Sequence, residues 1–87
     1  MKLTVIWQNP MRLPDERQKI ELAYRDRLIE LCGGVTEAFN YHEEHYRQHQ
    51  NPASQWARLN QVAHIEATKS LLPDERKLAV IRVVFEK

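Results

Sequence analysis

The sequence has very few residues that could cross-link the chain or anchor it in a membrane. Its single cysteine, Cys32, excludes an internal disulfide and a zinc site with several cysteine ligands. The longest apolar runs have about four residues, far fewer than the roughly 20 that span a bilayer. The first ten residues carry one positive charge and soon reach Pro10, which is not typical of a secretory signal peptide. We therefore expect a cytoplasmic protein that does not enter a membrane.

An excess of charge of one sign is also missing. Thirteen Lys and Arg residues face twelve Asp and Glu residues, so the net charge is +1. This balance lacks the basic excess that is typical of nucleic-acid-binding domains. Hydrophobic residues make up 43% of the chain, which argues against disorder. A length of 87 residues predicts one domain, residues 1–87.

The N-terminal third predicts a strand and then a helix. Residues 2–7 favour a strand because their β-branched side chains suit a pleated surface, and Asn9-Pro10 ends the run. Pro14 and Asp15 open the helix, with Asp15 and Gln18 at the spacing of a capping box. Its apolar face repeats at helical spacing, and Gly33-Gly34 ends it. The residues of this face are Ile20, Tyr24, Leu28 and Leu31. On its polar side, Glu21 and Arg25 are placed to form an i,i+4 ion pair.

Two more helices are predicted in the middle of the chain. The first runs from Thr36, as N-cap, to about His49, and the second from Asn51-Pro52 to about Leu71. Alanines on the second helix would allow a neighbouring helix to approach closely. Val62 and Ile65 lie on a different arc of that helix, which indicates burial on two sides or contact with a partner.

The last segment, Lys77 to Phe85, predicts a strand because it is rich in β-branched residues. A helix opened by Pro73-Asp74 is the alternative. The expected fold is therefore α+β, with three helices between short N- and C-terminal strands in the order β-α-α-α-β. Two strands make a marginal sheet with unpaired edges. A second copy of the chain or another protein could complete the sheet, and we expect a homodimer.

A group of histidines suggests one possible chemistry. His42, His45 and His49 fall within about 60° of arc on a helix, and imidazoles at such spacing are ligands for zinc, nickel or copper. The edge of an amphipathic helix explains the same spacing without a metal. We adopt this second interpretation and expect no cofactor.

A second possible chemistry involves Arg58 and His64. Their spacing resembles that of the arginine and histidine in HEPN-type ribonucleases, where the pair handles the phosphate and the proton. The resemblance implies an all-helical bundle, whereas residues 2–7 predict a strand. Leu59 also stands where that family often has a polar residue.

Aromatic and basic residues meet around the predicted second turn. Stacking and arginine contacts of this kind can bind single-stranded nucleic acid, but the glutamates of the second helix would repel phosphate. Our candidates for binding another macromolecule come from this region: Tyr41, His45, Arg47, Trp56 and Arg58.

No catalytic signature is present in this small and nearly neutral chain. We predict a non-enzymatic protein-binding module that regulates or inhibits a larger partner. In size it is similar to accessory proteins of phages and other mobile elements, which is an analogy only. The alternatives are a small histidine-dependent nuclease or metal-binding protein, and a nucleic-acid-binding regulator.

Overall fold

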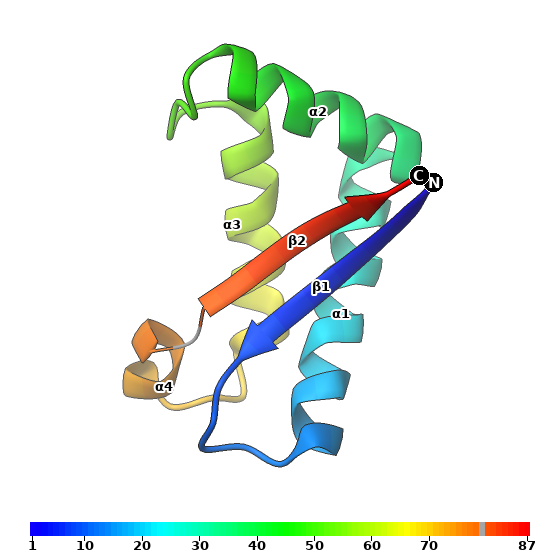
Figure 1. Ribbon diagram of the computed structural model, residues 1–87. Coiled ribbons are helices and arrows are strands. Elements are labelled where there is room, and N and C mark those ends of the chain that lie inside the picture. Colours follow the sequence, from blue (N-terminus) through cyan, green and yellow to red (C-terminus); the bar gives the residue numbers. More distant parts are fainter. Residues whose placement is uncertain (79) are drawn as a thin grey trace.

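The computed structural model describes residues 1–78 and 80–87, with the side chains of residues 76–78 and 80 left aside. Two strands lie side by side across one face of a pair of long helices, α1 and α3 (Figure 1). Helix α2 crosses near the end of the sheet where the two termini meet (Figure 1). The elements are β1 (Lys2–Gln8), α1 (Pro14–Cys32), α2 (Val35–Arg47), α3 (Gln55–Thr68), α4 (Pro73–Leu78) and β2 (Val80–Glu86).

The sheet joins the two ends of the chain. Strands β1 and β2 are antiparallel, and Val5 pairs with Val83 at the centre of the register. Because side chains alternate along a strand, every second residue of β1 faces the helices. Leu3, Val5 and Trp7 are all buried on this face. The α+β class and the terminal strands predicted from the sequence are confirmed.

Helix α1 begins and ends as its sequence predicts, but its N-terminal cap differs. The Glu16 carboxylate accepts a hydrogen bond from the Leu13 N–H at 3.4 Å, so the predicted Asp15–Gln18 capping box is wrong. At the other end, Gly33 has φ 92°, which glycine adopts without the strain of a Cβ. The Gly33 N–H donates to the Ile29 carbonyl at 3.0 Å and closes the last turn.

The next two helices lie where the sequence predicts them, but their ends differ from the prediction by two or three residues. Helix α2 starts at Val35 rather than after a Thr36 cap, and it ends at Arg47 rather than His49. His49 and Gln50 both have positive φ, so the chain has already left the helix there.

Helix α3 starts at Gln55 because Ser54, and not Asn51, is its N-cap. The Ser54 hydroxyl accepts from the Ala57 N–H at 3.1 Å. The Asn51 side chain instead accepts from the Ala53 N–H at 2.9 Å, which makes a local turn before the helix. The helix ends at Thr68, three residues before the predicted Leu71.

For the C-terminal segment the sequence offered a strand or a helix, and the structure has a helix followed by a strand. Pro73 opens the short helix α4, as the alternative prediction proposed, and the strand follows at Val80–Glu86. The predicted strand began at Lys77, which belongs to α4, and Ala79 lies outside the described residues.

The core lies between the sheet and helices α1 and α3. Tyr24 and Leu28 of α1 and Ala63 of α3 are buried there, and the small Ala63 side chain lets the helices approach closely. The Tyr24 hydroxyl donates to the Asn60 side-chain oxygen at 2.6 Å and ties the two helices together. Val62 and Ile65 lie on the outer face of α3 and are exposed. Within the described residues, no helix is both long and apolar enough to cross a membrane.

Candidate functional site

The three histidines of the possible metal site point to different surroundings. His42 lies in a cluster of aromatic rings, with ring centroids 4.7 Å from Tyr46 and 5.0 Å from Phe85. His45 Nδ1 is 2.6 Å from the Ser54 hydroxyl, and His49 lies beyond the end of α2. The part of the chain that the structure describes holds no group of three or more His, Cys, Asp or Glu residues placed to bind a metal. Although they are spaced along one helical arc, these three described histidines therefore do not lie together in one metal site.

Burial of His42 has an electrostatic consequence. Its Nδ1 atom is buried, and no hydrogen-bond partner for this atom is found among the described residues. Desolvation lowers the pKa of His42, partly offset by the nearby Glu43 carboxylate, while His45 lowers the pKa further. The ring is thus held neutral at physiological pH and serves as part of the packing between α2, α3 and β2.

The predicted binding residues do not form one surface. Trp56 is buried, Tyr41 packs against the core, and the exposed Arg47 pairs with Glu44 at 3.2 Å. Arg58 lies on the exposed side of α3.

The two residues of the ribonuclease-like spacing are also separated. Arg58 and His64 point about 120° apart around the axis of α3. The His64 ring instead lies edge-on to the Tyr24 ring of α1, with centroids 6.4 Å apart. The two side chains therefore lie in different surroundings, with Arg58 on the exposed side of α3 and His64 against α1.

Cys32 is a buried free thiol at the end of α1. Burial raises its pKa to about 11, and the Glu37 carboxylate adds to the shift. The thiol therefore stays protonated at neutral pH, which suits packing and not nucleophilic attack.

A different site is found along the outer edge of β1. The Trp7 N–H donates to the Glu21 carboxylate of α1 at 2.8 Å, and so it points away from β2. In an antiparallel pair, residues whose backbone groups point outward alternate with residues that bond the neighbouring strand. The N–H and C=O groups of Leu3 and Val5 therefore point outward on the same edge as the Trp7 N–H.

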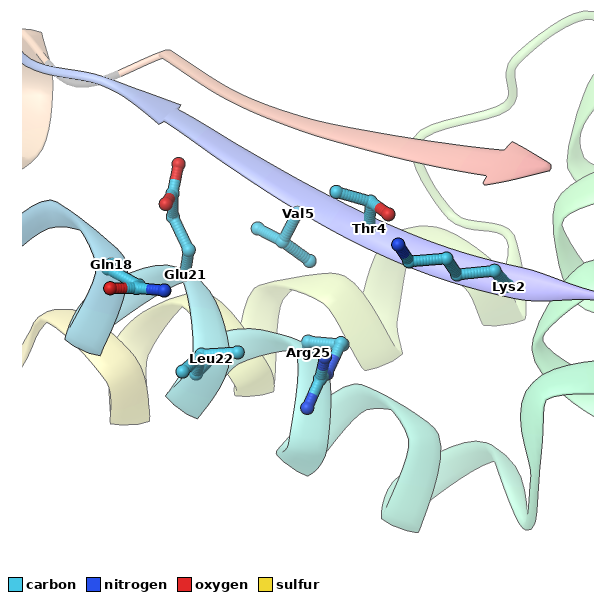
Figure 2. Close-up of a pocket in the computed structure, with 7 residues that line it drawn as sticks. All are labelled: Lys2, Thr4, Val5, Gln18, Glu21, Leu22 and Arg25. Atoms are coloured by element: carbon cyan, nitrogen blue, oxygen red, sulfur yellow. The ribbon is translucent and has the colours of Figure 1, made fainter.

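A groove runs between this edge and α1, with a volume of about 210 Å³. Figure 2 shows that Lys2, Thr4 and Val5 form its strand side, while the side chains of α1 lie opposite. Leu22 lines the helix side of the groove and is 40% exposed. The helix residues that line the groove are Gln18, Glu21, Leu22 and Arg25.

Sequence reasoning missed this groove because it assigned Glu21 another partner. The predicted Glu21–Arg25 ion pair is not the contact found: Glu21 binds the Trp7 N–H, and Arg25 pairs with Asp26 at 3.0 Å. Residues 7 and 21 are brought together only by the packing of β1 on α1. No local pattern in the sequence reports that packing.

Comparison with known proteins gives no further assignment: no family model, no curated protein and no solved structure matches this chain.

Proposed function

We propose that the chain is a non-enzymatic protein-binding module, which regulates or inhibits a larger partner by holding it in the groove beside β1. The outer edge of β1 carries this proposal. Its outward backbone groups at Leu3 and Val5 lie next to a groove, and backbone groups at a strand edge readily pair with another chain.

A further feature supports a binding role. Leu22 places an apolar side chain on the helix side of the groove, and protein interfaces combine such apolar contacts with polar rims. By size alone, regulators and inhibitors of phages and mobile elements are a matching class, and we propose a cytoplasmic location.

Substitution of the groove tests this function. Leu22→Lys places a charge in the groove, and Ile65→Lys is a matched control because Ile65 is a helical, 53% exposed side chain on the outer face of α3. Each tagged variant and the wild type are used to purify partners from cells of the native host, and captured proteins are quantified by mass spectrometry. We expect Leu22→Lys to lose a partner that Ile65→Lys retains. Loss with Ile65→Lys alone, or no specific partner at all, would contradict the proposal.

A further inference from the structure

The groove beside β1 has the features of a site for one extended strand. Resting on the proposed function, we infer that it binds an extended segment of a different protein, which adds antiparallel to β1 and carries an acidic side chain near Lys2. The outward N–H and C=O groups of Leu3 and Val5 supply the backbone hydrogen bonds of such a strand.

Glu21 sets one end of this site. Its carboxylate already accepts the hydrogen bond of the Trp7 N–H, at the place where the carbonyl of an added strand would otherwise lie. In Figure 2 the Glu21 side chain reaches up from α1 toward the strand, on the far side of Val5 from Lys2. The added strand therefore pairs with the N-terminal part of β1 and stops before Trp7.

Lys2 places a positive charge at the other end of the site, opposite in sign to the Glu21 carboxylate. It lines the groove, and its side chain extends along the strand edge in Figure 2. Lys2 takes part in none of the ion pairs found among the described residues, although Glu86 is its register partner. A segment with a carboxylate near Lys2, and none near Glu21, complements both ends.

The helical layer favours a lone segment over a second copy of the chain. In Figure 1, α1 runs beneath β1, so it also underlies the position of an added strand. Two copies that pair through β1 are related by a twofold axis at this edge, which brings both α1 helices to the same place. Strands lie about 4.8 Å apart, whereas a helix with its side chains is about 10 Å wide. A partner segment without its own helix beneath it avoids this overlap.

Amide exchange measured by NMR, with a synthetic peptide as probe, tests the inference. The probe is a six-residue peptide of alternating valine and threonine, with blocked ends and one aspartate next to its C-terminal end. We expect saturating probe to slow exchange of the Leu3 and Val5 amides by about tenfold or more. The Thr4 amide already bonds β2 and should not change. A control peptide with the aspartate next to its N-terminal end would meet Glu21 and should bind more weakly.

Charge reversal sharpens the result. Lys2→Glu should remove the preference for the C-terminal aspartate, and Leu22→Lys should remove binding of both peptides. Absence of protection at Leu3 and Val5 with every peptide would overturn strand addition. If Leu22→Lys still lost its cellular partner, the proposed docking role would nevertheless stand. Protection of these amides without peptide, together with a doubled mass in light scattering, would show that the occupant is a second copy.

Discussion

The two strands of the sheet are register partners, yet their surroundings differ on both face and edge. On the face toward the helices, Val5 of β1 is 5% exposed, whereas its partner Val83 of β2 is only half-buried. On the edges, β1 borders a groove in which Glu21 binds the Trp7 N–H. The C-terminal end of β2 instead meets rings of α2 and α3, with Phe85 packed on Phe39 and Trp56.

This difference places both the better packing and the proposed docking edge on β1. Strand β1 is fixed by its packing on α1, so its outer edge is held in one position without a partner. Strand β2 contributes its pairing and an aromatic contact with α2. A rigid strand edge costs little conformational entropy when a partner binds, so the packing that stabilises β1 would also favour the proposed binding at its edge.

The two paired valines give the largest predicted contrast. Val5→Ala should lower the free energy of unfolding by about 2–3 kcal/mol, because it removes two buried methyl groups and leaves a cavity. Val83→Ala should cost about half as much, because the half-buried Val83 side chain already contacts water. Both changes lose the same strand preference, so each serves as the control for the other. Urea denaturation measures the difference, and equal losses would show that the strands are equally packed.

The hydrogen bond between Glu21 and the Trp7 N–H should have a smaller effect on stability. Glu21→Ala should cost about 1 kcal/mol of stability, because the Trp7 N–H loses its acceptor. Exchange of the Trp7 amide should become faster, and exchange of the Ile6 amide should stay slow. Glu21→Gln retains an acceptor oxygen and is the matched control. If Glu21→Ala left Trp7 exchange unchanged, another group would be holding that N–H.

The ring of His42, in the aromatic contact beside β2, should have the smallest effect on the free energy of unfolding. That effect should be measurable only in mild acid. Burial lowers the pKa of His42, with Glu43 acting against the shift and His45 adding to it. The folded state therefore favours the neutral ring, and its contribution to stability is complete above the unfolded pKa of about 6.5. That contribution is lost as the pH falls through the lower folded pKa, when the unfolded chain binds the proton more readily.

His42→Gln should accordingly make the midpoint of urea unfolding less sensitive to pH between about 7.5 and 5. A wild-type dependence retained in His42→Gln would place the titrating group elsewhere.

Local signals in the sequence predicted much of the fold. Pro14, Gly33 and the β-branched residues of the two strands act over a few positions, so they identified α1 and the sheet correctly. The prediction was wrong where two signals competed. Asn51 and Ser54 are both good N-caps, and Asn51 instead formed a turn with Ala53.

The candidate site was harder to predict because its residues act through tertiary contacts. Helical spacing placed the histidines on one arc, but α2 ends before His49, and His45 binds Ser54. The Glu21 contact with Trp7 depends on how β1 packs on α1, and spacing along one helix favoured Arg25 as the partner instead. Spacing along one element shows which residues could meet, whereas packing between elements decides which of them do.

Amide exchange along β1 in the free, dilute protein tests the central claim most directly. If β1 is a fixed strand with an open N-terminal edge, the Leu3 and Val5 amides should exchange fast. The Thr4 and Ile6 amides should exchange slowly because they bond β2, and the Trp7 amide should also be slow because it bonds Glu21. Slow exchange at Leu3 and Val5 in the monomer would contradict the account, since that edge would already be occupied.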